Sequence, residues 1–224
     1  MTYAIYKISW NPIQGQQAVG GICGTAFFVE QYKAITAHHV LNSATFKTPN
    51  SGFLRCRYWL LGRDGRIIDC SSATVTDLPE IDLSVIRFNA SNLNAVVLSL
   101  SAEPVFAGVP VRNQGYNEGH GNVKLRWNNH DIDIECFDLS HSFSDGSGTV
   151  TSGHTANISC QDLKLDGVIV LKLSYGGSTG MSGGPLLIQA TSKVIGMMSF
   201  GLPPDVSKKD ELYAVSAREI LKRI

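Results

Sequence analysis

One segment of the chain carries a serine in a setting that suits nucleophilic chemistry. Residues 180–185 read Gly-Met-Ser-Gly-Gly-Pro and run into the apolar sequence Leu-Leu-Ile. Glycines on both sides of Ser182 allow a tight turn, in which the serine hydroxyl and nearby backbone N–H groups can converge on one point. No lysine follows the glycines, and a strand rather than a helix follows the serine, so a phosphate loop and a nucleophile elbow are both excluded. The segment is a candidate nucleophile turn.

Two other segments supply an imidazole and a carboxylate. The sequence Thr-Ala-His-His-Val at residues 36–40 follows a predicted buried strand, and Asp82 opens the alternating sequence Leu-Ser-Val-Ile-Arg-Phe. A half-buried carboxylate can accept a hydrogen bond from the second N–H of an imidazole and so fix its orientation. Taken singly, a histidine at a strand end is more often a surface residue, and an aspartate before a strand is more often a turn residue.

The order of the three segments makes them informative together. Histidine, aspartate and serine follow one another as in chymotrypsin, and in a different order from subtilisin and the α/β-hydrolases. The sequence resembles the trypsin/chymotrypsin-like serine protease superfamily, particularly its disulfide-free bacterial HtrA-like and viral members. The resemblance covers about residues 20–220 and is strongest in four motifs, Thr-Ala-His-His-Val, Ile-Asp-Leu-Ser-Val, Gly-Met-Ser-Gly-Gly-Pro and Gly-Met-Met-Ser-Phe-Gly.

The resemblance implies a catalytic role for each segment. Ser182 would be the nucleophile, and His39 the general base that takes its proton and later protonates the leaving amine. Asp82 would hold the imidazole tautomer and stabilise the imidazolium. The backbone N–H groups of Gly180 and Ser182 would form the oxyanion hole. No metal or cofactor is needed by this chemistry.

Two of these assignments have competing neighbours. The family pattern has a small residue before the catalytic histidine, which favours His39 over His38 as the base. Asp69 and Asp77 are alternative carboxylates, but only Asp82 directly precedes the Leu-Ser-Val-Ile sequence expected at that place. We therefore predict a His39–Asp82 pair.

The resemblance also implies where a substrate would bind. Ser199, Phe200 and Gly201 match the family's Ser-Trp-Gly at the end of its substrate-binding strand, which pairs with an extended peptide through main-chain hydrogen bonds. Gly176 stands where trypsin-like enzymes carry the group at the base of the specificity pocket. Met198 stands where proteases selective for Gln or Glu have a histidine. A small or apolar side chain before the cleaved bond is the expectation.

Met181 and the cysteines depart from the pattern of secreted digestive proteases. Met181 replaces the aspartate that captures a new N-terminus in those enzymes, so activation by N-terminal insertion is not expected. Cys23 matches a half-cystine of secreted members, but Val40 replaces its partner. The five cysteines contain no CxxC pair, and the first ten residues lack the pattern of a secretory signal. We expect free thiols, no metal site and a cytoplasmic location.

The composition favours a strand-rich globular protein. The chain has 224 residues, 43% of them hydrophobic, with 22 glycines and 19 basic against 19 acidic side chains. Zero net charge argues against binding nucleic acid through bulk charge, and no apolar run approaches the roughly 20 residues that a membrane helix needs. The expected partner is a protein or peptide substrate, with an unidentified regulatory partner or ligand as a further hypothesis.

Short apolar or alternating runs separated by turn residues predict an all-β fold. We expect two six-stranded antiparallel β-barrels of chymotrypsin type, in residues 1–100 and 101–224, joined by a connector at Asn89–Pro104. One short helix is expected at Ser216–Ile224, and a long polar loop, proposed to regulate activity, at Leu139–Asn157. Besides the alternating N-terminus, the predicted strands are Gly24–Glu30, Lys33–Thr36, Phe53–Leu61, Arg66–Thr76, Leu83–Phe88, Ala95–Leu98, Val109–Asn113, Val123–Trp127, Ile132–Phe137, Val168–Leu173, Pro185–Gln189, Lys193–Met198 and Tyr213–Val215.

Three functions use these features differently. A serine endopeptidase would place the three catalytic residues in a cleft between the barrels. An inactive protease fold would hold a peptide on its edge strand without cleaving it, but the sequence keeps every expected catalytic residue. An esterase could use the same residues on a non-peptide substrate, which only a panel of substrates can distinguish.

Overall fold

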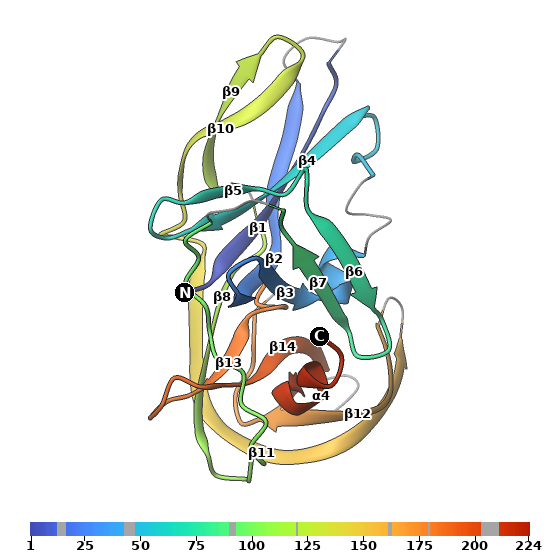
Figure 1. Cartoon of the computed structure of the whole chain (residues 1–224), viewed down its shortest axis with the longest axis vertical. Helices are drawn as coiled ribbons and strands as arrows, with labels where there is room; N and C mark the ends of the chain where they lie inside the picture. The colour runs from blue at the N-terminus through green and yellow to red at the C-terminus, as the bar shows by residue number, and fades with distance from the viewer. Residues whose placement is uncertain are drawn as a thin grey trace.

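The computed structural model of the chain describes residues 1–12, 17–42, 48–89, 93–119, 121–160, 163–178, 180–202 and 211–224 (Figure 1). Strands dominate this part of the chain, as the short alternating runs predict. They are β1 (Tyr3–Trp10), β2 (Ala18–Glu30), β3 (Lys33–Ala37), β4 (Arg55–Gly62), β5 (Ile67–Asp69), β6 (Thr74–Leu78), β7 (Leu83–Arg87), β8 (Pro110–Tyr116), β9 (Asn122–Asn128), β10 (Asp131–Asp138), β11 (Phe143–Cys160), β12 (Leu163–Leu173), β13 (Pro185–Ile188), β14 (Val194–Leu202) and β15 (Glu211–Ser216). The helices are α1 (His38–Leu41) and α4 (Ala217–Leu221).

The first half of the chain forms an antiparallel sheet in the order β5-β4-β1-β2-β3-β7-β6. Strand β1 runs through its middle and is buried on both faces. Because successive side chains of a strand point to opposite faces, Tyr3 and Ile5 enter one hydrophobic cluster, while Tyr6 and Ile8 enter another. The sheet therefore has a hydrophobic core on each side, and the core that contains Tyr6 and Ile8 is covered by an element outside the sheet.

That cover is the hairpin β9–β10, which comes from the second half of the chain but lies over the first sheet (Figure 1). Ile132 and Ile134 of β10 pack in the same cluster as Trp10 and Trp59. The indole N–H of Trp10 also donates to the carbonyl oxygen of His130, in the turn of the hairpin, at 3.2 Å. The two halves of the sequence thus share a core.

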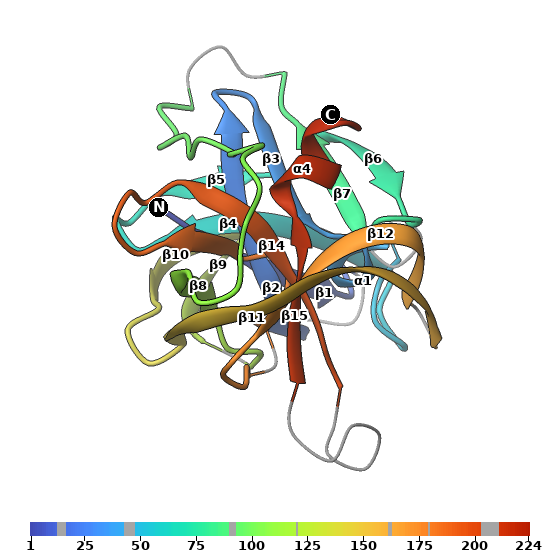
Figure 2. The same cartoon turned by 90° about the horizontal axis from the view of Figure 1, so that it is seen from below.

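The second half forms a closed six-stranded barrel in the order β11-β12-β15-β14-β13-β8. Figure 2 shows β11 and β12 sweeping around this barrel as long curved strands. A further hydrophobic cluster joins barrel and sheet, and its members include Phe27 and Leu83 from the sheet and Val170 and Val215 from the barrel. This shared cluster brings the ends of β3 and β7 close to β14.

The chymotrypsin-like, all-β fold class is confirmed, with one closed barrel and, within the described residues, a seven-stranded sheet in the first half. The predicted C-terminal helix is also confirmed: Ser216 caps α4 by accepting a hydrogen bond from the N–H of Arg218 at 3.3 Å. The division into residues 1–100 and 101–224 stays a prediction, and residues 90–92 of the expected connector lie outside the described part.

Three local predictions are wrong. The segment Leu139–Asn157 is no long loop, because most of it belongs to β11, which pairs with β8 along its first part and with β12 along its second. Ala95–Leu98 forms no strand and makes only an isolated bridge between Val97 and Phe28. Arg66–Thr76 contains two strands, β5 and β6, separated by a turn.

Candidate active site

The serine turn lies between β12 and β13 and depends on its glycines. Gly180 has φ +92° and Gly183 has φ +84°, the left-handed region that favours glycine. A Cβ on Gly183 would lie 2.1 Å from the backbone oxygen of Thr25, and one on Gly180 would lie 2.3 Å from that of Tyr116. Both glycines are therefore required by space as well as by conformation, and Ser182 is held on a tight turn packed against other strands.

His39 lies in the single turn of helix α1, which begins where β3 ends. Its ring Nδ1 lies 3.0 and 2.9 Å from the two carboxylate oxygens of Asp82, and its backbone N–H donates to Oδ1 at 3.0 Å. The backbone N–H of His38 donates to the carbonyl oxygen of Asp82, also at 3.0 Å. Backbone and side chain of Asp82 are thus both bound to the start of the helix.

Asp82 stands at the beginning of β7 in an unusual backbone conformation. Its φ is +49°, and its side chain is only 1% exposed. Asp and Asn adopt this region more readily than other residues with a Cβ. A buried carboxylate is costly unless it is hydrogen-bonded, and this one receives donors from both His39 and Ser199. Its burial makes it a suitable fixed partner for an imidazole.

Ser199 joins the carboxylate to the serine turn. Its hydroxyl donates to Oδ2 of Asp82, and its carbonyl oxygen accepts a hydrogen bond from the hydroxyl of Ser182 at 3.2 Å. The turn is also fixed to β14, because Gly183 N–H donates to the carbonyl oxygen of Met198 at 2.8 Å. The structure therefore brings His39, Asp82 and Ser182 into one place between sheet and barrel.

The competing residues lie elsewhere. Nδ1 of His38 is 3.3 Å from Oδ1 of Asp77, and the same oxygen accepts a hydrogen bond from Ser84 at 2.5 Å. Asp69 forms an ion pair with Arg57 at 2.5 Å. Each alternative carboxylate thus has a partner other than His39: Asp77 contacts His38 and Ser84, and Asp69 contacts Arg57.

Two backbone N–H groups of the turn can serve a negatively charged oxygen. Among the described residues, the N–H of Ser182 has no backbone carbonyl acceptor, whereas the N–H groups of Met181 and Gly183 donate to the carbonyl oxygens of Ser178 and Met198. Free N–H groups fixed in a rigid turn stabilise an oxyanion without having to reorganise during the reaction. The assignment of Gly180 and Ser182 as the oxyanion hole stays a prediction.

Met181 anchors the turn without charge. Its side chain is 4% exposed, and its sulfur accepts hydrogen bonds from the amide of Asn113 at 3.7 Å and from the backbone N–H of Ser178 at 3.4 Å. A thioether is a weak hydrogen-bond acceptor, so packing and two weak hydrogen bonds hold Met181 at the position where digestive proteases form an ion pair. The position that holds a carboxylate in digestive proteases is here a neutral part of the core.

The predicted substrate residues have different surroundings. Phe200 stacks on Tyr213 of β15, with ring centroids 4.8 Å apart. Gly201 follows it, one residue before the C-terminal end of β14. Met198 is 1% exposed and packs in the barrel core, whereas Gly176 is exposed in the loop before the turn. The hydroxyl of Ser199 serves Asp82 and is not free for a substrate.

Sequence reasoning missed three residues around the site, Thr25, Leu212 and Tyr213. Thr25 contacts the turn at two places, and Leu212 lies against Gly177, where an added Cβ would be 2.9 Å from its Cδ1. Burial, followed by the hydrogen bond to Glu211, raises the pKa of Tyr213 to about 12, so its hydroxyl stays neutral beside Phe200. Nothing in the local sequence around these residues distinguishes them from ordinary core positions.

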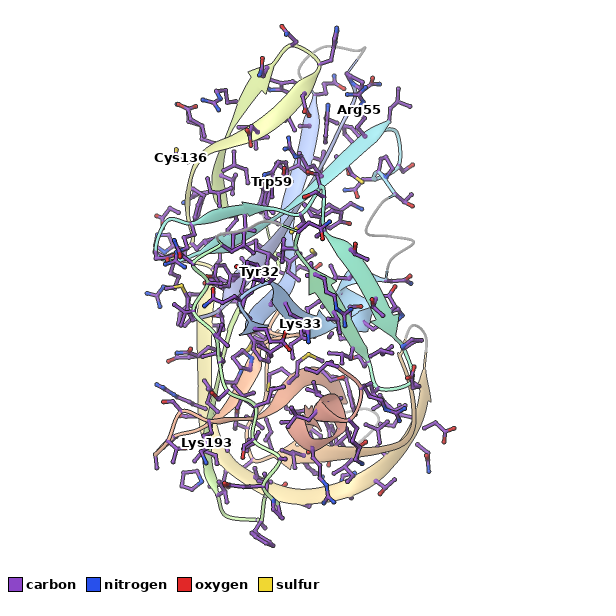
Figure 3. The ribbon with its side chains drawn as sticks, viewed as in Figure 1. Tyr32, Lys33, Arg55, Trp59, Cys136 and Lys193 are labelled. Carbon is purple, nitrogen blue, oxygen red and sulfur yellow. The ribbon has the colours of Figure 1, made fainter. Side chains whose placement is uncertain are left out.

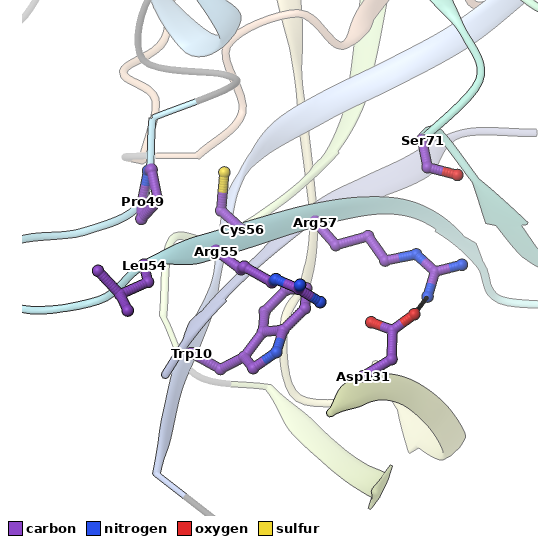
Figure 4. A pocket seen from close by; sticks show the side chains of 8 residues that line it. All are labelled: Trp10, Pro49, Leu54, Arg55, Cys56, Arg57, Ser71 and Asp131. Atoms are coloured by element: carbon purple, nitrogen blue, oxygen red, sulfur yellow. Dashed lines mark ion pairs between the residues drawn. The ribbon is translucent and has the colours of Figure 1, made fainter. Parts of the chain in front are cut away.

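A separate cavity of about 460 Å³ lies on the first sheet, away from these residues (Figure 4). Trp10 and Leu54 give it an apolar wall, while Arg57 on its floor lies 3.5 Å from Asp131. Figure 3 places Arg55, another lining residue, toward the end of the molecule that carries the β9–β10 hairpin. Its charges are mostly paired within the protein, and it shares no residue with the serine turn.

No group of three or more His, Cys, Asp or Glu side chains could hold a metal ion in the part of the chain that the structure describes. No helix in that part is long and apolar enough to cross a membrane.

Comparisons with solved structures agree with the fold. Solved structures with similar folds include the HtrA-type protease AlgW with decapeptide (TM-score 0.65, 15% identity, 99% of this chain and 63% of that chain). The active form of the Rv3671c protease from M. tuberculosis has a TM-score of 0.60 at 19% identity, covering 98% of this chain and 78% of that chain. The serine endoprotease from Yersinia pestis has a TM-score of 0.56 at 14% identity, covering 98% and 60%. The chain thus spans about six-tenths of the length of the HtrA-type structures.

No curated protein matches the sequence. Residues 24–197, which hold all three candidate catalytic residues, match the family model of the trypsin-like peptidase domain. The match covers well over half of the chain, and the chain belongs to the trypsin-like peptidase family.

Proposed function

We propose that the protein is a serine endopeptidase that cleaves peptide bonds through an acyl-enzyme intermediate. The observation that carries the proposal is the hydrogen-bonded series from His39 through Asp82 and Ser199 to Ser182. It joins an imidazole, a buried carboxylate and a serine hydroxyl from two halves of the chain. Membership of the peptidase family supports the same chemistry.

In the proposed reaction, Ser182 Oγ attacks the carbonyl carbon of the substrate while His39 Nε2 takes the hydroxyl proton. A hydroxyl donates one hydrogen bond at a time, so its O–H must rotate from the carbonyl oxygen of Ser199 toward the imidazole. Asp82 fixes the proton on Nδ1 and stabilises the imidazolium. The imidazolium then protonates the leaving amine, and water releases the acyl group through the same base.

The developing negative charge would lie on the former carbonyl oxygen. The N–H groups of Gly180 and Ser182 are the donors we assign to it, and each such donor typically contributes about 10²–10³ in rate. Because both belong to one glycine-bearing turn, the position of that turn relative to His39 controls the rate.

We also propose that a small or apolar side chain precedes the cleaved bond. Gly176 offers no charge, Met198 is buried, and the side chain of Leu212 lies over Gly177. An apolar wall without a nearby charge favours apolar side chains, since a buried unpaired charge or amide would be costly. Profiling cleavage with a peptide library tests this preference, and preferred cleavage after Arg, Lys, Glu or Gln would contradict it.

We place the protein in a reducing compartment such as the cytoplasm. Cys23, Cys56, Cys70 and Cys136 form no disulfide bond in the described part of the chain. Burial raises the pKa of Cys23 to about 12, so this thiol stays protonated and unreactive. Alkylation of the protein isolated from its source without a reductant should modify these four thiols after unfolding, and resistance of any pair would indicate a disulfide.

A fluorophosphonate probe gives the direct test of the proposed activity. It should label the wild-type protein and leave Ser182→Ala unlabelled, because the probe forms a covalent bond only with an activated serine. Digestion of a casein substrate should follow the same pattern. Absence of labelling in the wild type, or equal labelling of the alanine variant, would reject the mechanism. Labelling with turnover of esters but not of peptides would indicate an esterase.

A further inference from the structure

Thr25 of β2 contacts the serine turn, residues 180–183, through its backbone and its side chain. Its backbone N–H donates to the carbonyl oxygen of Ser182 at 3.0 Å. Its hydroxyl donates to the carbonyl oxygen of Gly180, also at 3.0 Å. The side chain is completely buried. One residue therefore holds the carbonyl groups of both residues that supply the proposed oxyanion donors.

The hydroxyl of Thr25 has no freedom to point elsewhere. It accepts a hydrogen bond from the backbone N–H of Tyr116 at 2.9 Å, so both its donor and an acceptor site are used. A Cβ on Gly115 would lie 3.0 Å from Thr25 Oγ1 and 3.0 Å from the Cα of Met181. The hydroxyl thus fills a narrow space between strand β8 and the serine turn.

Gly180 needs such an external contact. With φ +92° and no Cβ, its backbone has more conformational freedom than that of any other residue in the turn except Gly183. The peptide group that carries its carbonyl also carries the N–H of Met181, and it lies between the two peptide groups that carry the N–H of Gly180 and the N–H of Ser182. Its rotation would therefore displace both proposed donors. The hydrogen bond from Thr25 fixes that carbonyl in one orientation.

Thr25 also belongs to the sheet that carries the proposed base. Strand β2 pairs with β3, which leads directly into His39, and β3 pairs with β7, which follows Asp82. A contact from β2 to the turn therefore sets the serine relative to the His39–Asp82 pair as well as shaping the turn itself. The bond crosses from the sheet to the barrel, where the two halves must align.

We propose that the Thr25 hydroxyl is a positioning group that holds the oxyanion turn in its catalytic conformation. This inference rests on the proposed serine-protease function and adds a residue outside the candidate triad. Loss of a donor from an oxyanion hole costs about 10²–10³ in rate, and displacement by about 1 Å can cost 10². Removal of the positioning bond alone should therefore reduce the rate by about 10- to 100-fold.

The test compares three substitutions at this position. Thr25→Val keeps the shape but removes the hydroxyl, and should lower both kcat and the fluorophosphonate labelling rate by about 10- to 100-fold, with KM within about twofold. Thr25→Ser keeps the hydroxyl and should stay within about threefold of the wild type. Thr25→Cys supplies a weaker donor and should lie between them, which provides a readout if the valine variant does not fold.

Ser9→Ala is the matched control for stability. Ser9 is completely buried in β1, and its hydroxyl accepts a hydrogen bond from the N–H of Asn50 at 2.9 Å, outside the serine turn. Its removal should lower the melting temperature without changing the labelling rate of the folded protein. Rates are measured at a temperature where circular dichroism shows every variant folded. The pH midpoint of labelling should be the same for Thr25→Val and wild type, because the His39–Asp82 pair is untouched.

The outcomes separate this inference from the proposed function. Absence of labelling in the wild type rejects the enzyme itself. Normal labelling of the wild type, with Thr25→Val within threefold of it, overturns the role of Thr25 and leaves the enzyme standing. Equal losses in Thr25→Val and Thr25→Ser would also overturn it, since Thr25→Ser keeps the hydroxyl and the loss would then follow altered packing rather than the hydroxyl.

Discussion

Replacing Asp82 by Asn gives the sharpest test of the proposed catalytic residues. The change alters one atom, and Asn tolerates the φ of +49° at this position about as well as Asp. The side chain is 1% exposed, so water cannot compensate for the lost charge. The fold should therefore be kept while the chemistry of the site changes.

The contacts determine which way the new amide must lie. Oδ1 of Asp82 accepts from the backbone N–H of His39, so the oxygen of the amide must stay there to avoid two buried donors facing each other. The NH₂ group then takes the place of Oδ2, 2.9 Å from His39 Nδ1. There the ring nitrogen must accept, which moves the imidazole proton to Nε2. An imidazole in that tautomer cannot take a proton from Ser182.

We expect Asp82→Asn to lower kcat and the labelling rate by about 10⁴-fold, which corresponds to about 5.5 kcal/mol in the activation free energy. Stopped-time labelling with a fluorophosphonate, followed by mass spectrometry, measures the rate. Asp77→Asn is the matched control, because Asp77 is a partly buried aspartate beside the other histidine, His38, at 3.3 Å. It should stay within about threefold of the wild type. A loss below tenfold in Asp82→Asn, or equal losses in the two variants, would refute the assignment.

Three other predictions test the base, the turn and the surface charges. His39→Ala should lower the labelling rate on the order of 10⁵-fold and His38→Ala less than tenfold; equal effects would contradict the choice of base. Gly183→Ala should lower the free energy of unfolding, measured by urea denaturation, by about 3 kcal/mol or more, because its Cβ would lie 2.1 Å from a backbone oxygen. Gly52→Ala is the control: Gly52 has φ +86° and open space around it, so this change should cost about 1 kcal/mol. Burial alone would raise the pKa of Asp69, but hydrogen bonds from an arginine and a serine outweigh burial and lower that pKa. The wild type should therefore be more stable than Asp69→Asn by about 1 kcal/mol or less above about pH 5, and this advantage should disappear as the pH falls through the lowered pKa. An advantage that grows in acid would contradict this.

The candidate catalytic residues could be predicted because each has a local sequence context with a physical meaning. Positive φ at positions 180 and 183 requires glycine, and both positions carry it. Asp82 could be distinguished from Asp77 because an alternating strand begins immediately after it. For His39 and Ser182, the order of the motifs in the chain and their resemblance to the family pattern were needed as well, because order alone does not separate His39 from His38.

Strand β11 could not be predicted for a different reason. Its sequence is rich in Ser, Gly and Thr, and such residues form turns as readily as strands when read locally. The strand forms because its first part completes a ladder with β8 and its second part a ladder with β12. Closure of the barrel leaves no alternative partner for those backbone groups, so tertiary pairing overrides local preference.

Ser199 shows that tertiary contacts also decide the partners of a residue within the site itself. Its motif marks it as part of a substrate strand, yet its hydroxyl is turned to Asp82, and only its carbonyl oxygen reaches Ser182. Strand alternation predicts which face a side chain occupies, but the identity of its partner across two bodies depends on how they are docked. The role of this residue could be recognised only from the assembled structure.

The hydrogen bonds that hold the serine turn come from neutral groups on two sides. Thr25 binds it from the sheet, while Asn113 donates to the sulfur of Met181 and Met198 accepts from the turn on the side of the barrel. None of these groups titrates between pH 4 and 10. If the turn depended on an ion pair, activity would fall when that pair lost its charge; here the turn keeps its shape through that range. The pH dependence of labelling should then report the ionisation of His39 beside its carboxylate rather than the formation of the turn.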